Sequence, residues 1–369
     1  MMESEDKMST VHFGIVGGGW RAEFYLRIAR ALPERFVVEG MVVRDADKGR
    51  AIEETWGVST YRTVADLLHA VTPQFVVSCV PWEANPTIVK MLVEEDMLVL
   101  SETPPAPDVE GMEELWELVR EGARIQVAEQ YIHQPHHAAR LAFVADGLLG
   151  TVSQAKISAA HGYHGISLLR HFLGVGYENA RITAREFSSP LIGGPTRSGL
   201  PRQERIKESE QIIAWLEFEG EAAPRLGVFD FTGDQYFSWV RGQRLLVRGE
   251  RGELLNERAS YLLDYATPMQ VEFRRMSAGA RGNLEGYYLK GIVAGESWYY
   301  RNPFIPGRLS DDEIAVATAL AGMADYVEGG PEVYSLAEAC QDRYLDIMIA
   351  EAVDSGTTVS TETQVWAEV

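Results

Sequence analysis

Short apolar runs alternate with amphipathic stretches along the first third of the chain. The apolar runs are Val11–Val16, Phe36–Val43, Phe75–Val80 and Met97–Leu100. The stretches with helical spacing are Trp20–Leu32, Asp47–Trp56, Ala65–Leu68 and Pro86–Glu95. Strands that alternate with helices are typical of βαβ units. The pattern therefore predicts an α/β domain with a doubly wound parallel sheet at the N-terminus.

The second half has a different periodicity. Apolar and polar residues alternate, with glycines between the runs, in Gln211–Glu219, Leu226–Thr232, Leu245–Arg248 and Met269–Arg274. Alternation of this kind is typical of antiparallel strands with one buried face. It predicts an α+β domain with a mostly antiparallel sheet.

Three further features concern organisation rather than chemistry. The capping boxes Ser310-x-x-Glu313 and Ser335-x-x-Glu338 predict the starts of the last two long helices. Residues 188–210 are rich in glycine, proline and basic residues, which predicts a long loop serving either as a lid or as a subunit-contact arm. Trp215 should lie on the sheet face opposite Leu216, where helices or a second subunit would have to cover it.

Composition limits the possible partners. The chain has 369 residues, enough for about two domains, and its charge is 34 − 54 = −20. Such a surface repels nucleic acids and anionic membranes. The ten residues before the first strand are acidic and contain no apolar stretch, so we expect no secretory leader, and no apolar run approaches the ~20 residues that span a bilayer. With only two cysteines, Cys79 and Cys340, we expect a cytoplasmic protein in a reducing compartment.

The first strand and first helix are joined by Gly17-x-Gly19-x-x-Ala22, the context that a dinucleotide-binding fingerprint requires. Gly17 would permit the tight turn, Gly19 would let backbone N–H groups approach a pyrophosphate, and Ala22 would let the helix pack closely. Trp20 and Arg21 lie within this turn and are counted with the cofactor site. A tight turn that binds no phosphate is the alternative.

The end of the second strand bears on which dinucleotide binds. It reads Val42-Val43-Arg44-Asp45, so Val43 stands where NAD-binding folds usually have an acidic residue. Arg44 could bind a 2′-phosphate, which favours NADP, whereas Asp45 keeps NAD possible. The alternative is that Arg44 is simply a solvated loop residue.

Several motifs follow one another in an order known from one family. They are the glycine turn, the strand leading into Val80-Pro81, Ser101-Glu102-Thr103-Pro104, Gly147–Val152, His164–Arg170 and the closing segment from Ser335 to Ala352. Together they resemble the glucose–fructose oxidoreductase / inositol dehydrogenase / rhizopine-catabolism (Gfo/Idh/MocA) superfamily. The resemblance implies a Rossmann domain over residues 1–131 and a second domain over 132–369 with a large, open, mostly antiparallel sheet. The final helices would be able to pack back on the first domain.

The resemblance also implies further cofactor contacts. Val80, Pro81 and Asn85 lie in the loop that approaches the nicotinamide, and Glu102 and Thr103 belong to the Glu-Lys-Pro motif. Gln130, at the crossover into the second domain, would hydrogen-bond the carboxamide or a substrate hydroxyl, or have a structural role.

The chain departs from the family at its usual catalytic groups. Thr103 replaces the Lys, Ala160 replaces the Asp, and Asn85 stands where a His is common. A threonine cannot act as a base near neutral pH.

Three residues could still transfer protons. His161 and His164 are three apart, so at the start of a helix that ends at Leu173 they would share a face. We expect His164 to be the principal acid/base, with His161 or Tyr163 as auxiliary; capping or packing at the helix start is the alternative. His133 and His137 have metal-ligand spacing, but Pro135 lies between them and no other ligand is near, so we expect no metal.

The hypothesis that follows is an NAD(P)-dependent oxidoreductase, with NADP favoured, acting on a sugar, cyclitol or related polyhydroxylated or carbonyl compound. Two alternatives remain open: a nucleotide-binding sensor or structural homologue without turnover, and an eliminase or epimerase that recycles its cofactor. The resemblance further implies a homodimer or homotetramer formed through the C-terminal sheet.

Overall fold

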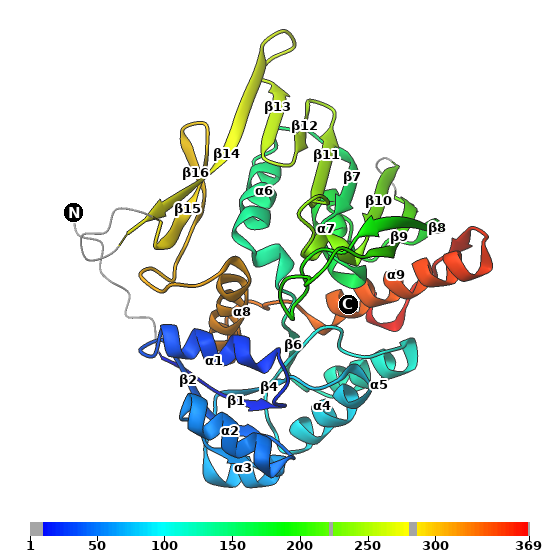
Figure 1. The fold of residues 1–369 in the computed structure, drawn as a ribbon. Coiled ribbons are helices and arrows are strands. Elements are labelled where there is room, and N and C mark those ends of the chain that lie inside the picture. Colours follow the sequence, from blue (N-terminus) through cyan, green and yellow to red (C-terminus); the bar gives the residue numbers. More distant parts are fainter. Residues whose placement is uncertain (1–9, 221–223, 280–285, 368–369) are drawn as a thin grey trace. The chain divides into compact units, whose positions relative to one another are not determined.

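The computed structural model describes residues 10–220, 224–279 and 286–367. The chain divides into two compact units. The first unit comprises residues 1–135, 277–290 and 302–340, and the second comprises 136–276, 291–301 and 341–369. Figure 1 shows both units as ribbons coloured along the sequence.

The first unit contains a parallel sheet of six strands. The strands are β1 (Val11–Val16), β2 (Phe36–Val42), β3 (Thr60–Tyr61), β4 (Phe75–Ser78), β5 (Val99–Ser101) and β6 (Ile125–Val127). Their order is β3-β2-β1-β4-β5-β6, and every pairing is parallel. This is the doubly wound order of a dinucleotide-binding fold, and its direction reverses between β1 and β4. The predicted α/β domain is confirmed.

Helices connect these strands. They are α1 (Ala22–Ala31), α2 (Ala46–Trp56), α3 (Val64–Ala70), α4 (Asn85–Glu94) and α5 (Val109–Arg120). Phe13 and Ile15 of β1 are fully buried beneath Tyr25 and Ile28 of α1, so the apolar run and the amphipathic helix form one core.

Helix α8 (Asp311–Val327) comes from much later in the chain and also belongs to the first unit. Arg27 of α1 donates from Nε to Oε1 of Glu313 at 2.5 Å. Ser310 and Glu313 form the predicted capping box, with each side chain accepting from the other residue's backbone N–H. This reciprocal contact fixes where α8 begins.

The second unit is built on a large, mostly antiparallel sheet, which confirms the second part of the predicted fold class. The sheet order is β16-β15-β14-β13-β12-β11-β7-β10-β9-β8-β17, and β10 and β7 pair in parallel. The strands are β7 (Val152–Ser158), β8 (Ala180–Ile192), β9 (Ile206–Phe218), β10 (Arg225–Phe231), β11 (Arg244–Gly249), β12 (Gly252–Leu255), β13 (Arg258–Leu262), β14 (Pro268–Ala278), β15 (Tyr288–Ala294), β16 (Ser297–Arg301) and β17 (Val359–Ser360). The helices of this part are α6 (Pro135–Ala145), α7 (Gly162–Leu173) and α9 (Leu336–Ser355).

Helix α7 covers one face of this sheet. A Cβ at Gly165 would lie 2.5 Å from the Phe229 ring, so the absence of a side chain there allows α7 to approach β10 closely. On β9, Leu216 is fully buried, whereas Trp215 is 57% exposed on the opposite face. The predicted alternation at these two residues is confirmed, and we call the side that carries Trp215 the open face.

The prediction of a loop over residues 188–210 is wrong at both ends. β8 and β9 form a long hairpin whose register pairs Ser188 with Glu210 and Ile192 with Ile206, leaving only residues 193–205 as the connection. In an antiparallel ladder only every second residue of a strand hydrogen-bonds to a given neighbouring strand. Gly193 donates its N–H to the Arg205 carbonyl, so Pro190, three residues earlier, falls at a position that makes no hydrogen bond to β9. The missing N–H of proline is therefore tolerated there. The proline content therefore misled the prediction.

Candidate active site

The glycine turn has the backbone geometry that the fingerprint requires. Gly17 has φ +119°, and a Cβ there would lie 2.0 Å from the Cys79 carbonyl oxygen. A Cβ at Gly19 would meet nothing within 4 Å, so backbone at this position faces open space. Ala22 is buried, as close packing of α1 demands. The turn is therefore tight on its inner side and accessible on its outer side.

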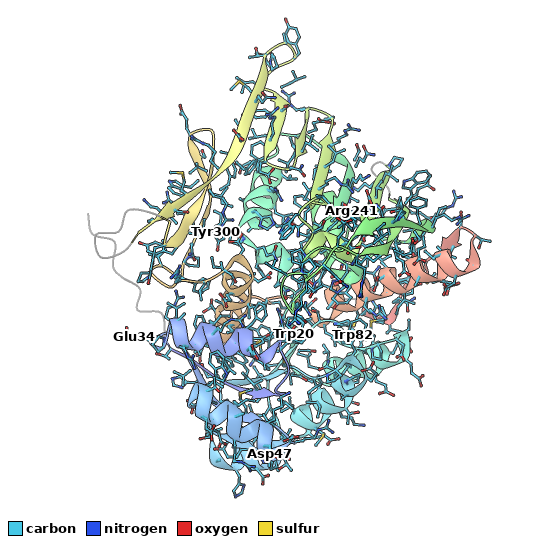
Figure 2. The ribbon with its side chains drawn as sticks, viewed as in Figure 1. Trp20, Glu34, Asp47, Trp82, Arg241 and Tyr300 are labelled. Carbon is cyan, nitrogen blue, oxygen red and sulfur yellow. The ribbon has the colours of Figure 1, made fainter. Side chains whose placement is uncertain are left out.

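No side chain caps the start of α1. The same is true of α4, whereas Asp45, Thr63 and Asp108 cap α2, α3 and α5 through side-chain oxygens. The first backbone N–H groups of a helix need an acceptor, and they carry partial positive charge. A pyrophosphate fits this requirement, so the residues present are suited to hold a dinucleotide. Trp20 is 54% exposed beside this turn, and Figure 2 labels it together with Trp82, which follows β4.

Arg44 and Asp45, just after β2, are the two residues that bear on whether NAD or NADP binds. Asp45 Oδ1 accepts from the N–H groups of Asp47 and Lys48 at 2.9 and 3.0 Å, so one carboxylate oxygen is committed to capping α2. Arg44 is exposed and makes no hydrogen bond or ion pair within the described residues. Its guanidinium is thus available for a 2′-phosphate, while Asp45 Oδ2 remains for a ribose hydroxyl.

Three predicted cofactor residues converge within the first unit. Arg21 donates from Nε to Glu102 Oε1 at 2.7 Å and from Nη2 to Gln130 Oε1, and Tyr25 OH also donates to Glu102. The Arg21 and Glu102 side chains are 13% and 11% exposed. Although burial opposes the charge, the Glu102 carboxylate raises the pKa of Arg21 above its ordinary value. Arg21 is therefore a fixed cation that orients Glu102 and Gln130 where β5 and β6 end.

Asn85 is held by hydrogen bonds inside the first unit. It is 2% exposed, accepts from Ser78 Oγ, and donates to Ser101 Oγ at 2.8 Å and to the Pro105 carbonyl at 2.7 Å. Both donors of its amide are used inside the unit, and its contact with a cofactor stays a prediction.

Val80, Pro81 and Thr103 lie at the same edge of the sheet. Val80 Cγ1 would lie 3.5 Å from a Cβ at Gly17, and Pro81 is exposed. Thr103 is half-buried directly after Glu102, and its N–H lies 3.4 Å from Glu102 Oε2. These positions are compatible with the predicted cofactor contacts.

The predicted acid/base residues form a cluster of rings at the start of α7 in the second unit. The His161 and His164 ring centroids are 5.0 Å apart, and those of Tyr163 and His164 are 4.5 Å apart. Tyr236, which the sequence reasoning missed, completes the cluster at 5.9 Å from His161. His161 is exposed as a residue, whereas Tyr163 and His164 are buried.

Two tyrosines hold His161. Tyr236 OH accepts from the His161 backbone N–H at 3.0 Å and lies 2.6 Å from His161 Nδ1. His161 Nε2 lies 3.4 Å from Tyr163 OH. Desolvation among these rings, followed by repulsion from His164 and Arg197, lowers the pKa of His161 to about 3.

The start of α7 depends on a residue of α9. A Cβ at Gly162 would lie 2.6 Å from Asp346 Oδ1, and Asp346 accepts from the Tyr163 N–H. Burial raises the pKa of Asp346 despite the nearby Arg343 guanidinium at 2.5 Å. Neither Asp346 nor Tyr236 has a local sequence signal, because each reaches the cluster from a distant part of the chain.

In residues 10–220, 224–279 and 286–367, no group of three or more His, Cys, Asp or Glu side chains is arranged to hold a metal ion. Over the same ranges, every helix is too short or too polar to cross a bilayer.

The family resemblance is confirmed over residues 11–130. These residues match the model of the GFO_IDH_MocA oxidoreductase family, described as an NAD-binding Rossmann fold. In the structure they form the parallel sheet and connecting helices that their motifs predicted. A search of curated proteins gave no match.

Solved structures extend the likeness in fold to almost the whole chain. A levoglucosan dehydrogenase in complex with NADH and levoglucosan has a TM-score of 0.68 at 15% identity, covering 95% of this chain and 99% of that one. A putative myo-inositol dehydrogenase from Sinorhizobium meliloti 1021 has 0.64 at 15%, covering 96% and 100%. An oxidoreductase from Agrobacterium radiobacter, in complex with NAD+, L-tartaric acid and magnesium, has 0.65 at 14%, covering 95% and 98%. At these identities the likeness concerns the fold.

Proposed function

We propose that this protein is an NAD(P)-dependent oxidoreductase that acts on a CH–OH group, or on the corresponding carbonyl, of a sugar, cyclitol or related compound. Residues 1–131 form the cofactor domain in this proposal. Residues 132–369 bind substrate and mediate subunit contact, apart from the late segments, including residues 302–340, that return to the first unit. The observation that carries the proposal is the pairing of an uncapped α1 with a glycine turn open on its outer side. The family match over residues 11–130 supports it.

NADP is the favoured cofactor in this proposal. Arg44 is exposed and makes no hydrogen bond or ion pair in the described chain, while Val43 has no acceptor to offer a ribose hydroxyl. Two of the similar structures are complexes with NAD+ or NADH, so the competing outcome is that Asp45 Oδ2 serves NAD. Titration with NADH and NADPH compares the two affinities directly.

The proton chemistry is assigned to His164. A bound nicotinamide would accept or supply the hydride, and a protein group must take or give the hydroxyl proton. Two imidazolium rings with centroids 5.0 Å apart would repel each other, so at most one of the two rings is charged. The lowered pKa of His161 keeps that ring neutral, and we therefore assign proton transfer to His164. His161 would help to position Tyr163, whose OH lies 3.4 Å from His161 Nε2.

The test combines cofactor binding with turnover. Wild-type protein should bind NADH or NADPH and oxidise at least one member of a panel of sugars and cyclitols. His164→Gln should retain cofactor binding but lower kcat by about 10²-fold or more, as loss of an acid/base predicts. His171→Gln, on the same helix with Nδ1 bonded to the Ser167 carbonyl, is the matched control and should leave kcat unchanged.

The other outcomes identify the alternatives. Cofactor binding without any turnover would favour a sensor or structural homologue. The replacement of the family's Lys and Asp by Thr103 and Ala160 is consistent with that alternative. Product formation without net reduced cofactor would indicate an eliminase or epimerase. Absence of nicotinamide binding by folded protein would refute the proposal as a whole.

We also propose that the chain forms a homodimer or homotetramer through the open face. Ile213, Trp215 and Phe187 are 39%, 57% and 60% exposed, and Phe187 pairs with Gln211, two residues from Ile213 on β9. Sedimentation velocity that found only monomers would refute this. A cytoplasmic location is proposed because the chain has only two cysteines, too few for a disulfide framework, and cell fractionation tests it.

A further inference from the structure

The second unit contains a polar cavity that the proposed proton chemistry does not use. Its volume is about 390 Å³, within the range of small-molecule sites. It is lined by Ser189, Gln211, Thr232, Gln235, Val240, Arg241, Gly242, Gln243 and Arg244. All but two of these residues offer polar side-chain groups, so the cavity is suited to a hydrophilic ligand.

Arg241 is the main charge of this cavity, and Figure 2 labels it. Its Nη1 donates to Ser209 Oγ at 3.2 Å and its Nη2 to Ser189 Oγ at 3.3 Å. Within the described residues it has no ion pair, and the nearby carboxylate of Asp234 is paired with Lys207. Neutral hydroxyls thus hold the guanidinium in place, and no carboxylate pairs with it directly.

The other charges add to the positive potential. Arg244 lies 3.6 Å from Asp230 Oδ2, but the same carboxylate is bound by Lys156 at 2.9 Å. One carboxylate therefore serves two cations, and Arg241 adds a third. In a chain of net charge −20, this concentration of positive charge around one cavity favours an anionic ligand.

The cavity is adjacent to the ring cluster. Gln235 lines the cavity and is fixed by donating from Nε2 to the Ser158 carbonyl at 3.0 Å and to the Gly242 carbonyl at 2.8 Å. The next residue, Tyr236, hydrogen-bonds His161. The cavity and the ring cluster are thus connected through two consecutive residues, Gln235 and Tyr236.

We propose that this cavity is an anion subsite and that the substrate carries a carboxylate or a phosphate held by Arg241 and Arg244. The proposal rests on the proposed function, because it names the substrate class of the same reaction. Arg241 provides the charge-assisted hydrogen bonds, whereas Gln211, Gln243 and Thr232 are placed to bind hydroxyls of the same molecule. Arg241 is a specificity-determining residue in this scheme and takes no part in proton transfer.

The experiment measures binding to wild-type protein, with and without NADPH, by isothermal titration calorimetry. The probes are D-glucuronate, glucose 6-phosphate, inorganic phosphate and neutral D-glucose. Both sugar anions should bind at least about tenfold more tightly than D-glucose, because hydrogen bonds to a charged group contribute about 1.5–3 kcal/mol, or 10- to 150-fold. Their affinity should fall as NaCl rises, and the stronger of the two identifies the anion as carboxylate or phosphate.

Three variants test the assignment to Arg241. Arg241→Gln should remove the preference for anions over glucose. Gln243→Glu should do the same by adding a negative charge at an exposed lining residue, which guards against misfolding of the first variant. Arg248→Gln, on the same strand as Arg244 but paired with Glu253 and outside the cavity, is the matched control and should keep the preference.

The outcomes separate this inference from the proposed function. Equal affinity for D-glucuronate, glucose 6-phosphate and D-glucose would overturn the anion subsite, even if NADPH binds and a neutral sugar is oxidised. Equal loss of preference in Arg248→Gln and Arg241→Gln would also overturn it. If anions bind through Arg241 but no nicotinamide binds at all, the proposed function fails while the anion site stands.

Discussion

Two glycine-to-alanine substitutions in one turn should have opposite consequences. At Gly17, φ is +119° and a Cβ would lie 2.0 Å from the Cys79 carbonyl oxygen and 2.8 Å from its carbonyl carbon. Strained backbone costs about 1–3 kcal/mol. Overpacking against neighbours that cannot move costs a similar ~1–3 kcal/mol. We therefore expect Gly17→Ala to destabilise the protein by about 2–6 kcal/mol.

Gly19→Ala should leave the fold intact. A Cβ there meets nothing within 4 Å, and alanine reduces the freedom of the unfolded chain, so stability should stay within about 1 kcal/mol of wild type. The new methyl group would occupy the space through which backbone N–H groups reach a pyrophosphate. We expect the Kd for NADH and NADPH to rise at least about tenfold, or ~1.4 kcal/mol.

The assay pairs urea unfolding with cofactor titration on both variants. Unfolding reports the backbone strain at Gly17, and NADPH fluorescence reports binding at Gly19. Wild-type cofactor affinity in Gly19→Ala would refute the inference that the outer side of this turn holds the dinucleotide. Wild-type stability in Gly17→Ala would refute the steric argument for the turn itself.

Two further predictions concern the second unit. Arg170 and Asp342 form a 2.7 Å ion pair, and their side chains are only 1% and 3% exposed. Arg170→Met removes one partner and leaves the Asp342 charge buried. We expect urea unfolding to show a loss of about 3–5 kcal/mol in stability. Arg120→Met, which breaks an exposed pair with Glu117, should cost less than ~1 kcal/mol, and equal effects would contradict the distinction. With its pKa lowered to about 3, His161 should show no NMR titration between pH 5 and 8. Between pH 6.5 and 3 the His161 side chain is protonated in the unfolded chain but not in the folded one, so its contribution to stability falls as pH falls through this range. The stability of His161→Gln should therefore decrease less steeply with falling pH than that of wild type. An NMR titration midpoint near pH 6.5 for His161 would contradict the lowered pKa.

Local chemistry along the chain was sufficient to predict several features of the molecule. The glycine turn, the alternation that buries Leu216 and exposes Trp215, and the Ser310 capping box each depend on residues close together in sequence. Backbone conformation at a turn and the side on which a strand residue points follow from the residues themselves. These predictions hold for that reason.

Other features required the folded chain. Residues 188–210 look like a loop by composition, but pairing between β8 and β9 extends the hairpin to Ile192 and Ile206. Arg21, Glu102 and Gln130 come from three different strand ends, and only the parallel sheet brings them within hydrogen-bond distance. Asp346 reaches the start of α7 from α9, and residues 302–340 return to the first unit. Each of these features depends on contacts between segments far apart in the sequence. The free energy of such contacts comes from burial and strand pairing, which a local pattern of residues does not specify.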